Sequence, residues 1–583
     1  MKKSIFLAAL AVLALSSTSC NDLLDIQPSD KYSSDAIWST ETSADYYIMA
    51  SYQHFKDHSI LSGHTRHYYD AYTDLYKSIT WLGADHMYNK EFMLASQFGK
   101  NNAADFASWS TAYGRIKRAN LLLNDLDKYA DRFDPEWVKI RRAEVRFAIA
   151  MNYFYIARVY GGFVIRTDKS GINGATDDGA NPEDCNRARA TEAESYDFIM
   201  KTMCESAEDL PESWGKGGTL EGRATKGMVY GFLSRVALFA KDWEMAANAA
   251  DSCAKYGKYK LVDNYADLFN YTKDESNLDE VIFAIYYKKE LATHGFDNAM
   301  RSPGDADRDK VSKSGYIVPT AELADTYEFV DGTPFSWQTW NKSTTKINVN
   351  GTPTQNTDPY TLREPRFHAT ILYDGAEWEG RTIQTYVGLT SSVPDGVDAY
   401  KPFSRAGTTD GHTCTGYYIR KYLMEGDTDF RTKGSTMTEI CLRYGEVLLN
   451  KAEALGMQGR IAEALVPLNQ IRARVGLPER TLADAPNISA FMNLLRKERI
   501  CELAGEGQRY WDLIRWGLAK EVIDGKSFHG VRITLSSTGR KNYNYDEDID
   551  DGYVHMFEDR YYRLSLPADE LTNNKLAVDN PGW

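Results

Sequence analysis

Apolar residues recur at helical spacing through the first half of the chain and again in its last third. The longest such segment, residues 136–160, is apolar on nearly every side, which predicts a largely buried helix. Asp134 and Pro135 are typical of a helix cap and a first helical residue, and Gly161 and Gly162 are typical of a helix end. We expect further helices at about 104–128, 191–210, 224–240, 243–256, 439–456, 460–475, 488–504 and 508–519.

Two stretches are rich in alanine and look like tetratricopeptide-type helix pairs. One pairs residues 233–239 with 243–250, and the other pairs 448–454 with 462–465. Small alanine side chains let two helices approach closely, and such pairs bury their apolar faces only by stacking on neighbours. The sequence therefore predicts a mostly α protein with a scaffold of stacked helices, although the pairs are too dispersed for a continuous solenoid.

The composition changes between about residues 258 and 437, where Gly, Pro, Asn, Thr and Asp become frequent. Short β-like runs at 281–285 and 417–422 are interrupted by polar loops at 301–314 and 341–358. Loops of this length in a compact protein are often functional. We predict a helical part at 38–257, a loop-rich part with a few short strands at 258–437, and a second helical part at 438–583.

The N-terminus is typical of a secretory signal peptide. Lys2 and Lys3 precede an apolar run at 5–15 that is too short to span a bilayer, and small residues follow it. Further along the chain, no segment approaches the roughly 18 consecutive apolar residues of a spanning helix. We therefore expect residues 1–19 to be removed on export.

Cys20 follows the small residues directly, in the position that is acylated in bacterial lipoprotein signals. Ser17 stands where those signals usually carry leucine. We predict that Cys20 is lipidated and that residues 20–37 form a tether between the lipid and the folded body. The alternative is an ordinary signal peptide cleaved near Ser19, with Cys20 as a free thiol.

Composition narrows the possible partners. The formal net charge of −14 and the pI near 5.4 argue against a nucleic-acid partner, which favours a basic surface. The chain contains 38 Tyr and 12 Trp. Aromatic faces suit stacking on sugars and packing in a helical core equally well, so their number alone does not separate the two roles.

Metal and redox chemistry have little support in the sequence. The six cysteines after Cys20 show no C-x-x-C spacing, so we expect small buried side chains rather than zinc ligands. His54 and His58 lie four residues apart on a predicted helix but lack a Cys or a clear carboxylate partner nearby. An aspartate series from Asp305 opens like a calcium loop, but Lys310 replaces the required glycine. We predict no metal and no cofactor.

No catalytic pattern is present. The chain contains no H-E-x-x-H, G-x-S-x-G, Walker-type or G-x-G-x-x-G motif. Charged residues between Arg496 and Arg515 alternate in sign at helical spacing, which indicates ion pairs along and between helices. The carboxylate pair of a glycoside hydrolase is defined in space rather than in sequence, so the sequence nominates no pair.

The same charged segment carries a family resemblance. Residues 494–517, LLRKERICELAGEGQRYWDLIRWG, closely resemble the signature of the SusD/RagB family. The stretch Ala504-Gly505-Glu506 departs from it, since the family usually has an aromatic residue before the Glu. Four further segments resemble the family in the same order, namely 142–162, LRYGEVLLNKAEA at 442–454, LNQIRAR at 468–474, and 563–583 ending in NPGW.

The resemblance implies about four tetratricopeptide-like helix pairs that support a loop-rich, ligand-facing part. It also implies a lipid-anchored, surface-exposed outer-membrane protein that captures oligosaccharides, or peptides in some relatives, for a SusC-like TonB-dependent transporter. A binding protein without catalytic activity is therefore the leading hypothesis. A surface glycoside hydrolase and a scaffold that binds only protein are the alternatives.

Aromatic residues with nearby polar groups mark two candidate ligand segments among the loops, because glycan capture combines ring stacking with hydrogen bonds to hydroxyls. The alternative for each aromatic residue is packing beneath its own loop. The candidates are Trp81, Asp85, Tyr88 and Asn89 in the first segment and Phe296, Arg301, Tyr316, Trp337 and Trp340 in the second.

Overall fold

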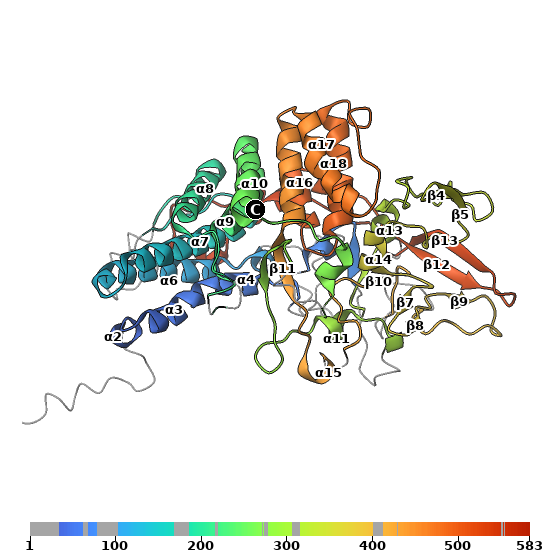
Figure 1. Cartoon of the computed structure of the whole chain (residues 1–583), viewed down its shortest axis with the longest axis horizontal. Coiled ribbons are helices and arrows are strands. Elements are labelled where there is room, and N and C mark those ends of the chain that lie inside the picture. The colour runs from blue at the N-terminus through green and yellow to red at the C-terminus, as the bar shows by residue number, and fades with distance from the viewer. Residues whose placement is uncertain are drawn as a thin grey trace, which may run out of the picture.

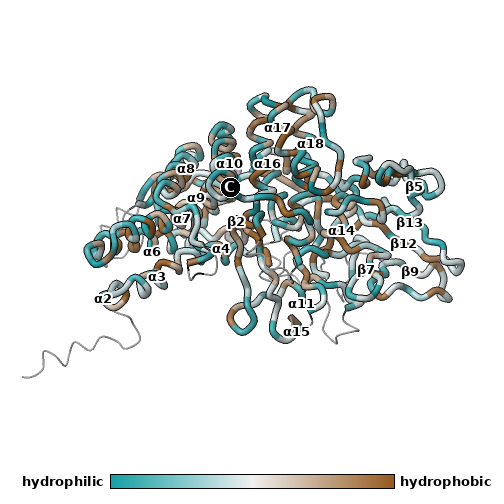
Figure 2. The backbone as a smooth tube through the Cα atoms, in the orientation of Figure 1, coloured by the Kyte–Doolittle hydropathy of each residue, from teal (hydrophilic) through white to brown (hydrophobic). Residues whose placement is uncertain are grey.

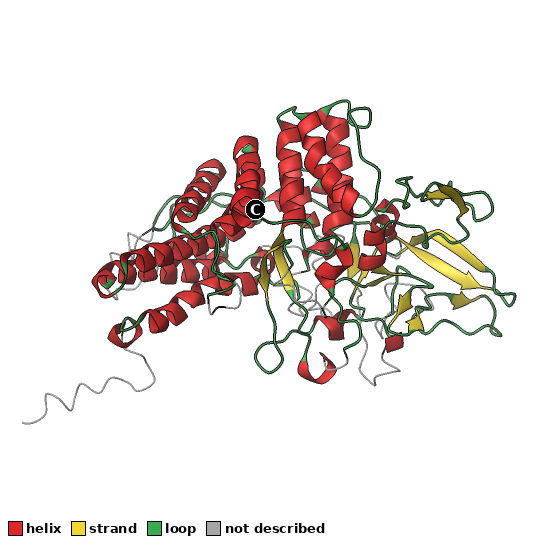
Figure 3. Ribbon diagram, in the orientation of Figure 1, coloured by secondary structure: helices red, strands yellow, loops and turns green. Residues whose placement is uncertain are grey.

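The structure is a computed structural model of the chain, shown in Figure 1. Helices occupy the left and top of the molecule in this view, and most strands lie at the right (Figure 3). The structure describes residues 34–61, 68–78, 103–167, 186–215, 218, 220–270, 272, 278–305, 315–399, 412–427, 430–549, 552 and 554–583.

The long helices form a stacked scaffold. They are α6 (Trp109–Lys128), α7 (Pro135–Tyr160), α8 (Glu192–Asp209), α9 (Lys226–Ala240), α10 (Trp243–Gly257), α16 (Tyr444–Met457), α17 (Ile461–Arg474) and α18 (Ile488–Leu503). Each packs on the next from α6 to α10, and α10 packs on α16, which contacts α17 and α18. Both alanine-rich pairs, α9 with α10 and α16 with α17, are confirmed. The prediction of a mostly α fold with a helix-pair scaffold is also confirmed.

Shorter helices connect and flank this scaffold. They are α2 (Ser34–Ile37), α3 (Glu41–Met49), α4 (Gln53–Asp57), α5 (Ala103–Phe106), α11 (Phe296–Met300), α13 (Ala321–Thr326), α14 (Pro365–Thr370), α15 (Phe430–Lys433), α19 (Arg509–Trp516), α20 (Ala519–Ile523) and α21 (Ala568–Asn573), with 3₁₀ turns at η1 (Ala50–Tyr52), η3 (Tyr69–Tyr72), η7 (Ala130–Arg132), η9 (Tyr265–Phe269) and η12 (Asp559–Tyr562). Among the described residues, no helix is both long enough and apolar enough to cross a bilayer.

The strands are short and form small separate sheets. They are β1 (Tyr76–Ser78), β2 (Val281–Ile285), β3 (Ile317–Pro319), β4 (Lys346–Val349), β5 (Thr352–Gln355), β6 (Ile371–Leu372), β7 (Glu377–Trp378), β8 (Arg381–Thr382), β9 (Val387–Gly388), β10 (Tyr418–Ile419), β11 (Glu439–Arg443), β12 (His529–Leu535) and β13 (Lys541–Asp548). The sheets pair β1 with β3, β2 with β11, β4 with β5, β6 with β10 and β7 with β8, and one has the order β13-β12-β9.

Two apolar cores underlie this arrangement. One lies between the helices and includes Phe147 and Leu495, and the other lies beneath the irregular region and includes Phe367. Figure 2 shows hydrophobic stretches both among the helices and around α14. The second core also includes Tyr68 and Val531, which lie outside residues 258–437 in sequence. The irregular region is therefore built from several parts of the chain.

Two predicted helix boundaries are wrong. The helix expected from residue 439 begins at Tyr444, because Glu439–Arg443 form β11 and pair antiparallel with β2. The helix expected at 508–519 ends at Trp516, because Gly517 adopts a left-handed conformation with φ of 70°. The β-like run at 417–422 contributes only the two residues of β10.

The cap predicted for α7 is confirmed, since the Asp134 carboxylate accepts from the N–H groups of Glu136 and Trp137 at 2.9 and 3.2 Å. Replacing Asp134 by alanine is expected to cost about 1 kcal/mol of stability, because these N–H groups lose their acceptor. The urea midpoint followed by circular dichroism measures this change. The exposed Asp131, in the turn before the helix, is the control position. Equal midpoints for the two alanine variants would contradict the prediction.

Candidate ligand-binding site

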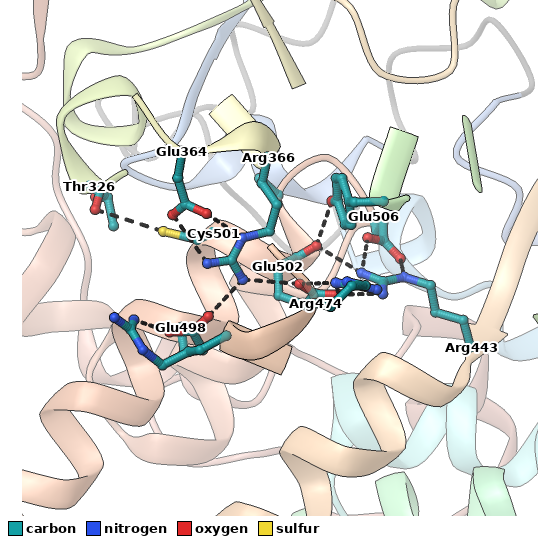
Figure 4. Close-up of polar contacts among 12 residues, drawn as sticks. Thr326, Glu364, Arg366, Arg443, Arg474, Glu498, Cys501, Glu502 and Glu506 are labelled. Carbon is teal, nitrogen blue, oxygen red and sulfur yellow. Dashed lines mark hydrogen bonds and ion pairs between the residues drawn. The ribbon is translucent and has the colours of Figure 1, made fainter. Parts of the chain in front are cut away.

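A buried network of ion pairs joins the helical scaffold to the irregular region (Figure 4). The Glu502 carboxylate of α18 accepts from Arg366 of α14 at 3.0 Å and from Arg443 of β11 at 2.6 Å. Arg474 of α17 donates to both of its oxygens, at 2.5 and 2.6 Å. All four side chains are buried. This network fixes α14 against α17 and α18.

The network remains charged despite its burial. Burial opposes the charged form of Glu502, but the three guanidinium groups around it outweigh that cost and hold its pKa well below the usual range. Further along the segment, Asp512 pairs with Arg499 at 2.7 Å and with Arg515 at 2.8 Å. Ion pairing between helices, predicted for the charges from Arg496 to Arg515, is therefore confirmed.

A polar pocket of about 240 Å³ opens beside α14. Pro365 begins this helix, and the next two residues, Arg366 and Phe367, are buried. His368 and Ala369 come next and line the pocket. Two other segments, at 264–270 and 420–425, and Trp378 of β7 complete it. The polar side chains that line it are Asn264, Asp267, Asn270, His368, Arg420 and Glu425.

Hydrogen bonds hold several of these side chains in place. Arg420 pairs with Glu425 at 3.0 Å and donates to the His368 carbonyl oxygen at 3.2 Å. The Asn264 amide donates to Asp267 at 3.1 Å. Burial lowers the pKa of His368 to about 4, so its imidazole is neutral at pH 7. The pocket thus combines neutral donors and acceptors with the ion pair between Arg420 and Glu425. This arrangement is suited to a polar, hydroxyl-rich ligand.

The wall of the pocket depends on Trp378, which is almost fully buried. Its indole N–H donates to Asp305 at 3.0 Å, and the guanidinium of Arg301 lies 5.3 Å from its ring centre. Arg301 is itself held by Asp297 at 3.1 Å and Glu379 at 2.8 Å. Asp305 is the first residue of the aspartate series that was considered as a calcium loop. In the structure its carboxylate instead accepts a hydrogen bond from Trp378 in the pocket wall.

The structure places Arg301 and Phe296, two of the predicted ligand contacts, in the interior of the protein. Arg301 is only 3% exposed because it is enclosed by carboxylates behind Trp378. Phe296 is fully buried in the second core, with its ring 6.4 Å from that of Tyr422. Both side chains are enclosed in this arrangement, and Arg301 supports the pocket wall through Trp378.

The remaining described candidates, Tyr316, Trp337 and Trp340, lie at two other places. The Trp337 ring stacks on Tyr545 of β13 at 5.6 Å, and its N–H donates to Asp325 at 3.1 Å. Trp340 is partly exposed and packs edge-on against Trp337 at 5.9 Å. Tyr316 is partly exposed, and its backbone N–H donates to the Ala299 carbonyl. Trp337 and Trp340 therefore pack against β13, whereas Tyr316 lies beside α11, the helix that begins with Phe296.

The other candidates, Cys20, Trp81, Asp85, Tyr88 and Asn89, lie outside the described residues. Ser78, the last described residue before residues 81–89, pairs with Ile317 in the β1–β3 sheet. Because Tyr316 directly precedes Ile317, it lies at the same edge of this small sheet as Ser78.

The histidines considered for a metal site have other surroundings. Burial lowers the pKa of His54 to about 3, and His58 stacks on Tyr155 at 3.9 Å. The described residues contain no group of three His, Cys, Asp or Glu side chains arranged to hold a metal ion. The described cysteines, 204, 253, 414, 441 and 501, are buried or half-buried.

A wider groove of about 740 Å³ lies on the helical scaffold, between α8, the α9–α10 turn and the end of α19. Two arginines in its lining are committed to ion pairs, Arg563 with Glu192 and Arg515 with Glu453. Ala193 of α8 is exposed at its edge. This groove is formed mainly by helices, and it provides a comparison site for the polar pocket.

Sequence reasoning missed all six polar side chains of the pocket. They come from three segments that only the folded chain brings together, and no motif connects them. The one local signal is the Asn264-x-x-Asp267 spacing at the start of η9, where Asn264 is the N-cap, and it is typical of a turn rather than of a ligand site.

Known proteins resemble this chain over nearly its whole length. SusD-like protein P38 of Formosa agariphila is 23% identical over 560 residues, covering 89% of this chain and 92% of that protein. The crystal structure of a SusD-like protein from Bacteroides fragilis has a TM-score of 0.71 at 26% identity, covering 96% of this chain and all of the other. A SusD-like carbohydrate-binding protein from the same species has a TM-score of 0.72 at 23% identity, covering 93% and 99%.

Two family models match complementary parts of the chain. The model described as "Starch-binding associating with outer membrane" matches residues 22–238. The model described as "SusD family" matches residues 279–583, which include the motifs at 442–454, 468–474 and 494–517. This second match alone covers more than half of the chain. The protein therefore belongs to the SusD/RagB family.

Proposed function

We propose that the protein is a lipid-anchored, surface-exposed outer-membrane protein that captures a glycan and passes it to a SusC-like TonB-dependent transporter, without catalysing a reaction. Family membership carries this proposal, because the matching models name the SusD family and starch binding at the outer membrane. One structural relative is also described as carbohydrate-binding. Acylated Cys20 is the proposed anchor.

The polar pocket beside α14 is the proposed contact surface for the glycan. A sugar unit presents hydroxyl groups that both donate and accept, and the pocket offers two amides, a neutral imidazole and charged groups within about 240 Å³. Tyr316 and Trp340 remain proposed ring contacts because both are partly exposed. Trp81, Asp85, Tyr88 and Asn89 also remain proposed contacts.

Affinity electrophoresis in gels that contain starch, laminarin, xylan or galactomannan tests the proposal directly. We expect at least one neutral polysaccharide to retard the protein and no reducing sugar to be released during prolonged incubation. Released sugar that disappears after a single carboxylate substitution would instead identify a hydrolase. Retardation by none of the polysaccharides, together with binding of peptides, would identify a peptide-binding subunit. Copurification from outer membranes tests the transporter partnership.

Glycan binding is expected to change by less than about twofold between pH 5.5 and 8. The reason is that burial lowers the pKa of His368 to about 4, so the imidazole stays neutral over this range and gains a proton only at lower pH. Isothermal titration calorimetry across the range measures the affinity. A transition near pH 6.5 that disappears in His368→Gln would contradict the prediction.

A further inference from the structure

A small niche lies between α18 and α19, within the segment that carries the family signature. Its volume is about 10 Å³, which is about the space of one water molecule. Arg496, Gln508 and Trp516 in its lining are partly exposed, so its rim lies at the surface. The polar side chains that line it are Arg496, Arg499, Gln508, Arg509, Asp512 and Trp516.

Two of the three arginines in this lining have carboxylate partners. Arg499 donates to both oxygens of Asp512, at 2.7 and 3.0 Å. Arg509 donates to both oxygens of Asp74, at 3.0 and 2.9 Å. Each of these pairs is neutral as a unit, so the charge of the niche depends on Arg496.

Arg496 forms no ion pair among the described residues. Its guanidinium donates to the Asn493 side-chain oxygen at 3.3 Å and lies 5.4 Å from the ring centre of Trp516. Its Nε–H group is buried and has no acceptor. Because nearly all buried donors in native proteins have a partner, this group indicates a place for a bound water or ion.

The charges around Arg496 do not neutralise it directly. Burial is the main cause that lowers its pKa, and the positive charges of Arg509 and Arg515 act in the same direction. Glu453 and Glu521 act against them, but Glu453 already pairs with Arg515 and Glu521 is exposed on α20. A guanidinium keeps its proton at pH 7, so a water in the niche would satisfy the N–H group and leave the charge without compensation.

We propose that this niche binds a phosphate or sulfate group, with one oxygen seated against the Nε–H of Arg496. The niche has room for one oxygen atom, so the rest of the anion lies at the rim beside Gln508 and Arg509. Arginine binds such oxyanions strongly, because its planar N–H groups match their oxygens and the bonds are assisted by charge. The niche shares no lining residue with the polar pocket beside α14, so this site does not depend on glycan capture.

Isothermal titration calorimetry with sodium sulfate and sodium phosphate tests the site, at an ionic strength held constant with sodium chloride. We expect saturable binding by the wild-type protein and affinity at least about tenfold weaker in Arg496→Gln. Arg496→Lys keeps the charge but loses the planar group and its Nε–H, so its affinity should fall between the two. Arg496 has no ion-pair partner to lose, and both variants should therefore keep the urea midpoint of the wild type.

Arg460→Gln is the matched control, because it removes one positive charge from an arginine that pairs with Glu463 on the exposed surface of α17. This variant is expected to bind both anions as the wild type does. Absence of saturable binding by the wild type, or equal affinity in Arg496→Gln, would overturn the site. An equal loss in Arg460→Gln would also overturn it, since the effect would then report overall charge.

Two further measurements identify the source and the place of the anion. Binding of glucose 6-phosphate with the affinity of inorganic phosphate would support a phosphate group carried on a larger molecule, and binding of inorganic phosphate alone would support a free ion. Wild-type crystals soaked in selenate should show an anomalous peak beside the Nε of Arg496. A niche without such a peak at saturating selenate would overturn the proposal, whatever the variants show.

Discussion

Replacing Glu502 by alanine is expected to lower the stability of the protein by about 3–5 kcal/mol. Glu502 is fully buried at the centre of the network in Figure 4, where Arg366, Arg443 and Arg474 all donate to it. Removing one partner of a buried ion pair leaves positive charge without compensation in a low-dielectric site. The urea midpoint followed by circular dichroism measures the loss.

The expected loss is large but not complete unfolding, because all three arginines keep another carboxylate. Arg366 still contacts Glu498 at 2.7 Å, and Glu280 still contacts Arg443 at 2.8 Å and Arg474 at 3.0 Å. Glu463 provides the control, since it pairs with Arg460 on the exposed surface of α17. Glu463→Ala is expected to leave the midpoint unchanged. A Glu502→Ala protein as stable as this control would show that the network contributes nothing.

The long helices were predictable because their signals are local. Periodic apolar residues, the Asp134 cap and the Gly161 stop define α7 without reference to the rest of the chain. The start of α16 could not be predicted from local signals. Ile440 and Leu442 fit a helix as well as a strand until β2 is placed beside them. Pairing with a strand more than 150 residues earlier decides that boundary.

The candidate site was even less predictable from local sequence signals than the helix boundaries. Aromatic residues in loops were chosen as ligand contacts, yet Phe296 and Trp337 fill the second core, because a large apolar ring gains most from burial. Arg301 was chosen as a hydrogen-bond donor, and three carboxylates surround it. The polar pocket arises where residues 264–270, α14 and residues 420–425 meet, and this meeting is a property of the tertiary structure.

Filling the polar pocket with Ala369→Trp is expected to reduce glycan affinity at least about tenfold, to the limit of detection in affinity gels. Ala369 is partly exposed on α14 and lines the pocket, so an indole there occupies the space proposed for the sugar without removing a buried contact. The residues that anchor the helix, Arg366 and Phe367, are unchanged, so circular dichroism and the urea midpoint should match those of the wild type.

Ala193→Trp is the matched control, because Ala193 is an exposed helical alanine that lines the wider groove on the scaffold. We expect this variant to bind glycan as the wild type does. The opposite result, binding lost with Ala193→Trp and retained with Ala369→Trp, would move the ligand from the loop-built pocket to the helix-built groove. Because both substitutions add the same ring to a partly or fully exposed alanine of a helix, a difference between them reports position rather than size. Normal binding by both variants would exclude both cavities and direct attention to the partly exposed rings of Tyr316 and Trp340.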